Sequence, residues 1–247
     1  ELKTPWRELV AERLRAAVAL RQKALPLMPQ TDAFRLINGE GDDLSGLIVD
    51  NYCGHLVVEV LARWVLCELE FVLAALSEAF RPLGEVKSVR LRIEDDAQRQ
   101  EGFTEAELAP LAKRPEGAKS CEITELGLRY AVDLAEGQKT GFFLDQRDSR
   151  LLCRQLANGR DVLNLFSYTG GFTLNALKGG AASVTSVDRS AKALELLAQN
   201  IELNGLSGAS TILAEDIKRY LPQAEQDTKR YGLVICDPPP LARKRAH

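Results

Sequence analysis

The sequence predicts an α/β protein whose second half is a parallel sheet with helices between the strands. Four short apolar runs rich in β-branched residues occur in this half, each separated from the next by a segment of helical periodicity. They are residues 162–166, 183–188, 211–216 and 233–240. The first run ends in a loop containing Gly170 and Gly171, and the second ends in Asp188. Strands that alternate with helices of this length form right-handed crossovers and hence a parallel sheet.

The first half predicts a smaller α/β domain. Residues 5–23 carry apolar side chains at helical spacing and predict an amphipathic helix, which Pro26 and Pro29 end. Strand-like runs joined by turns rich in Gly and Asp follow. We expect strands at 34–37, 46–49, 55–61 and 86–93, and a helix at about 66–80. Nothing in these residues identifies a reaction.

A hairpin is expected between the two halves. The charged stretch 94–117 predicts a loop or frayed helices, and residues 121–125 and 128–134 then flank Leu126 and Gly127 as two short strands. Helical spacing continues from 142 to 156. The expected domains are therefore an N-terminal helix and linker at 1–30, a central domain at 31–120, and a hairpin plus parallel-sheet domain at 121–247.

The helix at 190–203 has recognisable ends. Ser190 is a suitable N-cap, and Asn204 with Gly205 is a suitable stop. The loop with Gly170 and Gly171 and the strand that ends in Asp188, which precede this helix, suggest a ligand site. A strand, a glycine turn and a helix let a ligand approach the backbone closely at the positive end of the helix, although such glycines often only end a strand.

Composition bounds the function. A chain of 247 residues with 45% hydrophobic and 27% charged residues can bury a sizeable core, and its net charge of -3 argues against a uniformly basic nucleic-acid binder. A local basic patch is still enough to bind RNA. Basic residues gather near both ends, at Lys3, Arg7, Arg13, Arg15, Arg21, Lys23, Arg243, Lys244 and Arg245. Interleaved Glu8 and Glu12 favour a solvated helix face for the first group.

Cysteine and histidine usage argues against a metal site. The five cysteines are odd in number and have no CxxC spacing, and only two histidines are present. Neither a disulfide framework nor a zinc site is predicted. The sequence also has no apolar run of membrane-spanning length and no secretory signal. We therefore expect no membrane partner, no metal and a cytoplasmic location.

Several motifs occur in a fixed order along the chain. They are RLINGEGDDLSGLIVDNY at 35–52, GQKTGFFLDQRDSR at 137–150, VLNLFSYTGGF at 162–172, VTSVD at 184–188, AED at 214–216 and CDPPP at 236–240. Together they resemble the class I S-adenosylmethionine-dependent methyltransferases, and more closely the large-subunit rRNA cytosine-C5 methyltransferase family. The resemblance covers about 210 of the 247 residues.

The resemblance implies a Rossmann-like methyltransferase sheet preceded by a small α/β domain. Only the first four of the seven strands of such a sheet are found before His247. The small RNA-binding domain of the PUA type that usually precedes the segment from Leu2 onward is not found either. We therefore expect a chain that lacks the usual N-terminal domain and the C-terminal strands.

The implied cofactor is S-adenosylmethionine, whose groups suit several of these residues. Asp188, at a strand end, would accept hydrogen bonds from the two ribose hydroxyls, with a solvated strand-end aspartate as the alternative. Asp216 and the backbone at Ile217 would bind the adenine. Phe166 and Tyr168 would line the methionine and sulfonium side, where a cation gains from aromatic faces, with core packing as the alternative.

The resemblance adds two further groups to this site. The backbone at Thr169 and Gly170 would approach the cofactor closely. The segment at 137–150 is expected to close over it, and its candidate residues are Gln138, Lys139, Thr140, Asp145 and Arg147. Arg147 has an alternative as a simple ion-pair partner of Asp145 or Asp148, and helical spacing places Asp145 and Arg147 on different faces.

Transfer to cytosine C5 needs a nucleophile, because the ring carbon is unreactive until a cysteine thiolate adds to C6. The resemblance places this cysteine beyond the four strands found here. Asp237, at a strand end, would hydrogen-bond to the target base and is the candidate catalytic residue. Cys236 lies in what the sequence predicts to be a buried parallel strand and is interpreted as a core residue.

Three functions stay open at this point. The first is an RNA methyltransferase acting on cytosine C5 of large-subunit (23S) rRNA. The second is a methyltransferase of the same fold with guanine or a small molecule as the acceptor. The third is a non-catalytic RNA-binding or cofactor-binding remnant. RNA is the expected partner, and a homodimer is left open.

Overall fold

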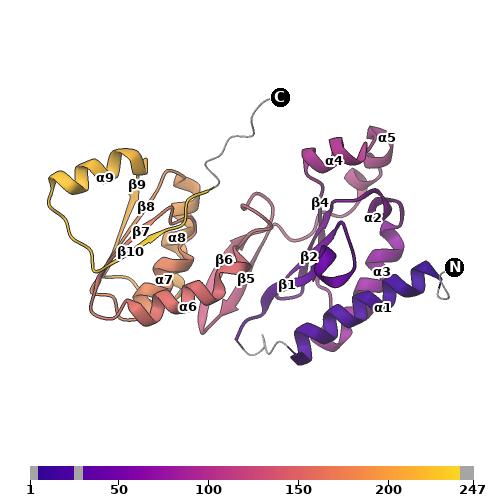
Figure 1. Ribbon diagram of the computed structural model, residues 1–247, viewed down its shortest axis with the longest axis horizontal. Helices are drawn as coiled ribbons and strands as arrows, with labels where there is room; N and C mark the ends of the chain where they lie inside the picture. The colour runs from indigo at the N-terminus through magenta and orange to yellow at the C-terminus, as the bar shows by residue number, and fades with distance from the viewer. Residues whose placement is uncertain (1–4, 25–29, 240–247) are drawn as a thin grey trace. The chain divides into compact units, whose positions relative to one another are not determined.

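The computed structural model describes residues 5–24 and 30–239, and the chain divides into two compact units (Figure 1). Unit 1 comprises Glu1–Glu125 and Val132–Leu144, and unit 2 comprises Leu126–Ala131 and Asp145–His247. The N-terminal helix belongs to unit 1 together with the central sheet. Pro26, Pro29 and the basic residues Arg243, Lys244 and Arg245 lie outside the described residues.

Unit 1 is built on a four-stranded mixed sheet. Its strands are β1 (Ala33–Asn38), β2 (Leu47–Tyr52), β3 (His55–Val60) and β4 (Ser88–Arg92), in that spatial order. The first three pair antiparallel, and β4 pairs parallel to β3 after a helical crossover. The four strands expected in this half are confirmed.

Two helices cover one face of this sheet. They are α1 (Trp6–Ala19), which continues as a π-helical turn to Ala24, and α3 (Leu69–Phe80). The buried face of α1 carries Val10 and Leu14 at helical spacing, and these pack with α3 over the strands. A single helix was expected at 66–80. It is instead divided at Glu68 into α2 (Arg63–Cys67) and α3, and the Glu68 carboxylate accepts a hydrogen bond from Arg7 at 2.7 Å.

The charged stretch that was expected as a loop or frayed helices forms two short helices, α4 (Asp95–Glu101) and α5 (Glu105–Leu108). Thr104 and Glu107 form a capping box that fixes the start of α5. The Arg63 guanidinium holds this helix in unit 1 through a 2.5 Å ion pair with Glu107.

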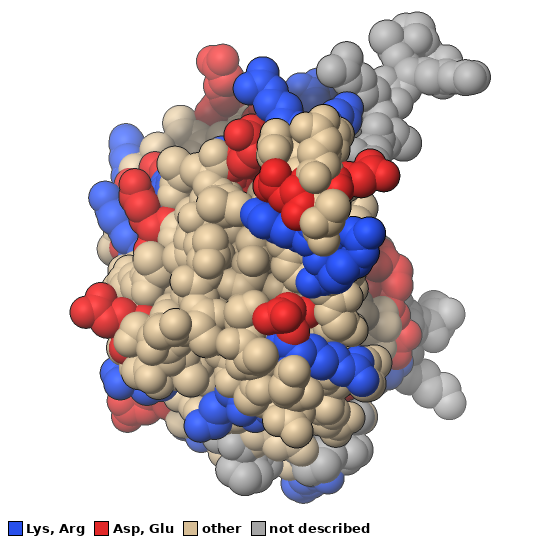
Figure 2. All heavy atoms as spheres, turned by 90° about the vertical axis from the view of Figure 1, so that its left-hand side faces the viewer, with Lys and Arg blue, Asp and Glu red and all other residues tan. Residues whose placement is uncertain are grey.

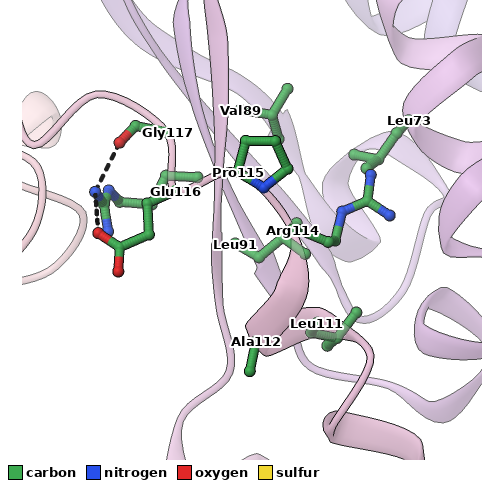
Figure 3. A pocket seen from close by; sticks show the side chains of 10 residues that line it. Leu73, Val89, Leu91, Leu111, Ala112, Arg114, Pro115, Glu116 and Gly117 are labelled. Carbon is green, nitrogen blue, oxygen red and sulfur yellow. Dashed lines mark hydrogen bonds and ion pairs between the residues drawn. The ribbon is translucent and has the colours of Figure 1, made fainter.

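A pocket of about 430 Å³ opens beside these helices (Figure 3). Its apolar wall includes Leu73, Val89 and Leu111. Two arginines line it, and both are engaged within unit 1. Arg90 donates to the carbonyls of Gly117 and Ala118 and pairs with Glu116, and Arg114 pairs with Glu70. The pocket contains none of the residues that the sequence predicts for a cofactor site.

The expected hairpin is confirmed. It consists of β5 (Ser120–Glu125) and β6 (Leu128–Asp133). Leu126 and Gly127 between them have φ values of 52° and 73°. Two consecutive positive φ values are the geometry of a tight type I′ turn, whose twist matches that of the strands it joins.

Unit 2 is built on a four-stranded parallel sheet. Its strands are β7 (Asp161–Leu165), β8 (Ser183–Asp188), β9 (Ser210–Ala214) and β10 (Leu233–Cys236), in the spatial order β10-β7-β8-β9. Its helices are α6 (Arg147–Leu156), α7 (Gly171–Lys178), α8 (Ala191–Leu203) and α9 (Ile217–Gln226). The predicted parallel α/β sheet is confirmed, with β7 in an interior position.

Helices pack on both faces of this sheet. Cys153 of α6 and Ala176 of α7 pack with Val162 and Val184 on one face. Tyr220 of α9 packs with Leu163 and its neighbours on the other. Strand β7 is therefore covered on both sides, which explains its nearly continuous apolar run.

The predicted ends of α8 are confirmed, whereas α6 starts later than expected. The Ser190 hydroxyl accepts a hydrogen bond from the Ala193 N–H at 3.3 Å and caps α8. Helical structure was expected from Phe142, but α6 begins at Arg147 after a short 3₁₀ turn. Phe142 precedes that turn, and its N–H donates to the Tyr52 hydroxyl of unit 1 at 3.2 Å.

The prediction that Cys236 is a buried core residue is wrong. Strand β10 lies at one edge of the described sheet and alternates between a half-buried and an exposed face. Leu233 and Ile235 pack on the cluster around Val162, so Val234 and Cys236 point to the other side and are exposed.

Thiol labelling tests this assignment. Cys236 and Cys67 are exposed, whereas Cys153 is buried, and burial raises the pKa of its thiol to about 11. Because the thiolate is the reactive form, a raised pKa keeps Cys153 protonated and unreactive at pH 8. We expect Cys236 and Cys67 to be alkylated in the folded protein and Cys153 only after unfolding, with mass spectrometry locating the label. Equal rates at Cys153 and Cys236 would contradict the assignment, and Cys236→Ser serves as the control that removes one fast site.

Candidate functional site

The order in which the chain adds strands to the parallel sheet reverses between β7 and β10, and the carboxyl ends of these two strands mark that switch point. From β7 the chain proceeds to β8 and β9 on one side, whereas β10 lies on the opposite side of β7. Open parallel sheets bind their ligands outside the strand ends at such a switch point. The loop at 166–170, Asp188 and Asp237 each follow or end a strand at this edge.

The loop after β7 is strained. Phe166 and Tyr168 have φ values of 57° and 48°, and Gly170 has 90°. Left-handed backbone is rare for bulky side chains and costs about 1–3 kcal/mol per residue. It persists only where the surrounding structure holds it, and such residues gather at ligand sites.

Ser167, between the two aromatic residues, has a buried hydroxyl. The residue is 5% exposed, and its Oγ has no hydrogen-bond partner within the described part of the chain. Its backbone is satisfied, since its N–H donates to Val187 at 3.2 Å and its carbonyl accepts from Gly170 at 3.0 Å. A buried hydroxyl without a partner costs about 1–3 kcal/mol.

Gly170 is required where the loop enters α7. It is the N-cap residue of that helix, and a Cβ built on it would lie 2.7 Å from the Leu197 Cγ of α8. Any side chain here would meet both this contact and the left-handed backbone. The glycine therefore lets α8 pack directly under the loop.

Asp188 is tied to the same loop. Its Oδ2 accepts the Tyr168 N–H and its Oδ1 accepts the Ser190 N–H, each at 2.9 Å. A carboxylate offers about four acceptor positions, so these two bonds orient the group and leave capacity for a ligand. The structure thus brings together Asp188, Tyr168 and the glycine loop, as the sequence predicts.

A buried polar network joins the elements on either side of the loop, and sequence reasoning missed it. The Asn164 Nδ2 donates to the Thr173 Oγ1 at 2.9 Å, and that hydroxyl shares a 2.7 Å hydrogen bond with the Ser186 hydroxyl. All three side chains are at most 1% exposed. They connect β7, the first turn of α7 and β8. The signal was present in the sequence as polar residues inside apolar strand runs.

Asp216 and Ile217 lie after β9, next to the end of β8. The Glu215 N–H donates to the Asp188 carbonyl at 3.0 Å, which aligns the two strand ends. Asp216 is exposed, and its Oδ1 accepts the Lys218 N–H at 2.8 Å as the N-cap of α9. Ile217 packs on the core beside Tyr220, where Phe166 also packs. Core packing is therefore one established role of Phe166.

Asp237 is exposed just beyond β10. The Gln146 Nε2 donates to its Oδ2 at 3.4 Å, a long contact between the turn before α6 and the strand end. Asp145 in that turn is exposed, and Arg147, the first residue of α6, is half-buried.

The other predicted segment, at 138–140, is held within unit 1. The Thr140 hydroxyl is 1% exposed, donates to the Asp50 Oδ2 at 2.6 Å and shares a 2.7 Å hydrogen bond with Tyr52. Burial, followed by the negative charge of Asp50, raises the pKa of Tyr52 and keeps its hydroxyl protonated. The Thr140 side chain is thus committed to the scaffold of unit 1.

Arg92 fixes the backbone of the same segment. Its guanidinium donates to the carbonyls of Leu134 at 3.0 Å and Gly137 at 3.2 Å, and also to that of Lys139. Lys139 has a φ of 51°, and its ammonium lies 4.6 Å from the centre of the Phe143 ring. Sequence reasoning missed Arg92, because its acceptors are backbone carbonyls, which every residue has, and no side chain in the sequence indicates the contact.

No helix within residues 5–24 and 30–239 is both long and apolar enough to cross a bilayer. Nor do three His, Cys, Asp or Glu side chains in these ranges come together in a way that would hold a metal ion.

Comparison with known proteins gives consistent findings. The family model for S-adenosylmethionine-dependent methyltransferases matches residues 108–246. The chain is 36% identical over 239 residues to ribosomal RNA large subunit methyltransferase I of Erwinia tasmaniensis, covering 96% of this chain and 59% of that protein. It is 38% identical over 244 residues to a ribosomal RNA large subunit methyltransferase of Deinococcus radiodurans, covering 96% and 58%. The chain therefore spans less than two-thirds of the length of these relatives.

Solved structures agree. SMU.776, assigned as a methyltransferase and solved in complex with SAH, superposes with a TM-score of 0.80 at 26% identity, covering 97% of this chain and 60% of that one. A protein from Streptococcus mutans assigned as a SAM-dependent methyltransferase gives a TM-score of 0.79 at 26% identity, with the same coverage of 97% and 60%.

The buried polar network is open to test by Thr173→Val, which keeps the shape and removes the hydroxyl. It leaves the Asn164 amide and the Ser186 hydroxyl without this buried partner, so we expect the free energy of unfolding to fall by about 1–3 kcal/mol in urea titration. Thr211→Val on the exposed side of β9 is the matched control and should change stability by less than about 0.5 kcal/mol. Equal effects of the two substitutions would show that the network contributes nothing specific.

Proposed function

Because the chain belongs to the S-adenosylmethionine-dependent methyltransferases, we propose that it uses this cofactor to methylate large-subunit ribosomal RNA. The relatives from Erwinia tasmaniensis and Deinococcus radiodurans, which are named for that substrate, support the choice of acceptor. We propose 23S rRNA as the partner and the cytoplasm, where ribosomes are assembled, as the location.

One observation carries the cofactor proposal: a half-buried carboxylate is hydrogen-bonded to a strained loop at the switch point of the sheet. We propose that Asp188 accepts hydrogen bonds from the ribose hydroxyls, through the acceptor positions that Tyr168 and Ser190 do not use. The ribose is the part of the cofactor that a strand-end carboxylate best recognises.

The methionine end of the cofactor suits the loop itself. Its carboxylate would be stabilised by the positive N-terminal end of α7, which begins at Gly171. Tyr168 would lie beside the sulfonium. The backbone of Thr169 and Gly170 would form the wall of this subsite, and Asp216 with Ile217 would contact the adenine.

We propose that the segment with Gln138, Lys139 and Thr140, together with Asp145 and Arg147, contributes to cofactor binding, as the resemblance implies. Within unit 1, Thr140 would act by holding the backbone of its neighbours, because its hydroxyl is already bonded to Asp50 and Tyr52. The bound cofactor would supply an electrophilic methyl group, and the protein residues would orient it.

For the acceptor atom we propose cytosine C5, with Asp237 hydrogen-bonded to the target base. Its exposure at the end of β10 leaves the carboxylate accessible, and Gln146 contacts one of its oxygens. The reaction also needs a thiolate to add to C6. The resemblance places that thiolate elsewhere, yet the exposure of Cys236 removes burial as an argument against it.

Charge on the described surface limits where RNA would bind. Figure 2 shows basic and acidic side chains interspersed around a broad uncharged area, without a continuous basic surface on that face. In the N-terminal helical segment, Arg7, Arg13 and Arg21 are paired with Glu68, Asp43 and Asp42. These ion pairs favour a solvated helix face for the N-terminal basic group. We therefore propose that RNA binds to a small basic patch and not to a broad basic surface.

Cofactor binding tests the first part of the proposal. In calorimetric titration with S-adenosylmethionine we expect saturable binding by the wild type, weakening by about 10- to 100-fold in Asp188→Asn, and loss in Asp188→Ala, because bonds to a charged acceptor contribute about 1.5–3 kcal/mol each. Asp161→Ala at the opposite end of β7 is the control and should bind like the wild type. Unchanged affinity in a folded Asp188→Ala protein would reject this site.

Methyl transfer tests the second part. We expect tritium from labelled S-adenosylmethionine to enter protein-free large-subunit RNA and not small-subunit RNA, with the loss of activity in Asp237→Ala exceeding tenfold, since removal of a group that orients the base misplaces the reacting atom. Label in guanine or in a small molecule would replace the proposed acceptor. Cofactor binding without transfer to any RNA would favour a non-catalytic role, and Cys236→Ala in the same assay decides whether that thiol takes part.

A further inference from the structure

We propose that Asn200 of α8 is a positioning residue for the cofactor loop, which it joins to strand β6 through its buried side-chain amide. This inference rests on the proposed function, because it assumes that the loop at 166–170 binds S-adenosylmethionine. Asn200 itself touches neither the cofactor nor the acceptor in this proposal, and it acts through the backbone of Thr169.

Both the nitrogen and the oxygen of the Asn200 side-chain amide are hydrogen-bonded. Its Nδ2 donates to the Thr169 carbonyl at 3.1 Å and to the Ala131 carbonyl at 3.5 Å, and its Oδ1 accepts the Ala131 N–H at 2.7 Å. The side chain is fully buried. An amide group has two donors and one acceptor oxygen, so one residue holds both a loop and a strand.

Asn204, four residues later, repeats only the strand half of this arrangement. Its Oδ1 accepts the Arg129 N–H at 2.9 Å, and its Nδ2 donates to the Arg129 carbonyl at 2.7 Å and to the Asn200 backbone carbonyl at 2.8 Å. Four residues of helix rise about 6 Å and two residues of strand about 6.6 Å, so the two asparagines match alternate residues of β6. Helix α8 thereby bonds to the backbone of β6 as a neighbouring strand would.

The same face of α8 also supports the loop by packing. Leu197 lies three residues before Asn200 and is fully buried, and it is the residue that a side chain at Gly170 would strike. Residues three apart share a helix face. Helix α8 therefore supports the loop at two points: Asn200 donates to the Thr169 carbonyl, and Leu197 packs next to Gly170.

The Thr169 carbonyl matters because it is buried within a strained segment. Thr169 is 4% exposed and follows Tyr168, whose left-handed backbone needs outside support. A buried carbonyl that loses its donor tends to rotate towards another one. Rotation of the Thr169–Gly170 peptide would turn the Gly170 N–H away from the Ser167 carbonyl, to which it donates at 3.0 Å, and would so disturb the proposed wall of the methionine subsite.

The test compares Asn200→Asp with Asn204→Asp. Each substitution keeps an acceptor oxygen for a β6 N–H and removes the donors, but only the first removes the bond to the loop. In calorimetric titration at pH 8 we expect Asn200→Asp to bind S-adenosylmethionine about tenfold more weakly than the wild type, the effect of one lost hydrogen bond. Asn204→Asp should stay within about twofold.

A pH series tests whether a restored hydrogen-bond donor at this position restores the affinity. A carboxyl at this buried position has a raised pKa, and once protonated it donates a hydrogen bond again. The affinity of Asn200→Asp relative to the wild type should therefore recover between pH 8 and pH 5.5. Asn200→Ala, which introduces no titrating group, should stay equally weak across the series, and circular dichroism checks that each variant is folded.

The outcomes separate this inference from the proposed function. Wild-type affinity in a folded Asn200→Asp or Asn200→Ala protein would overturn the inference, and so would equal loss in Asn204→Asp. If Asn200→Asp does not fold, the affinity of Asn200→Ala for S-adenosylmethionine decides the inference: weaker binding than the wild type supports it, and equal binding overturns it. Absence of binding by the wild type would instead reject the proposed cofactor site, whatever the variants do.

Discussion

Phe166 and Tyr168 adopt left-handed backbone in the loop after β7, and much of unit 2 is arranged to hold them there. Asp188 accepts the Tyr168 N–H from one side, and Asn200 donates to the Thr169 carbonyl from another. The hydroxyl of Thr173 connects β7, which precedes the loop, with α7, which follows it, and with β8. Each support is a hydrogen bond from a buried or half-buried side chain, so the strain is offset by bonds that would be costly to lose.

Unit 1 uses the same physical device on a different segment. Arg92 donates to the carbonyls of Leu134, Gly137 and Lys139, and Asp50 accepts the Thr140 hydroxyl while pairing with Arg35 at 2.9 Å. Charged groups anchor backbone that has no regular secondary structure. Within unit 1, these bonds fix the backbone around Lys139 and Thr140, two residues that the sequence linked to a function only by resemblance.

Much of the fold was accessible from the sequence because it depends on local patterns. The apolar runs predicted the strands of both sheets, Leu126 with Gly127 predicted the hairpin turn, and Ser190 predicted the start of α8. The candidate loop and Asp188 were found because glycines and an acid followed strand-like runs. Supporting residues such as Asn200 and Arg92 were not found, since each bonds to backbone that is distant in the sequence.

The sequence by itself determined the alternation of strands and helices, the family resemblance and the side chains at the strand ends, because these depend on periodicity and residue type. Only the tertiary structure decided which strands are neighbours and which faces are covered. Cys236 shows the difference: its apolar run predicts burial, but burial depends on what lies beside β10 in the described sheet. Ser167 shows it too, because an unpaired hydroxyl is a property of the packed neighbourhood.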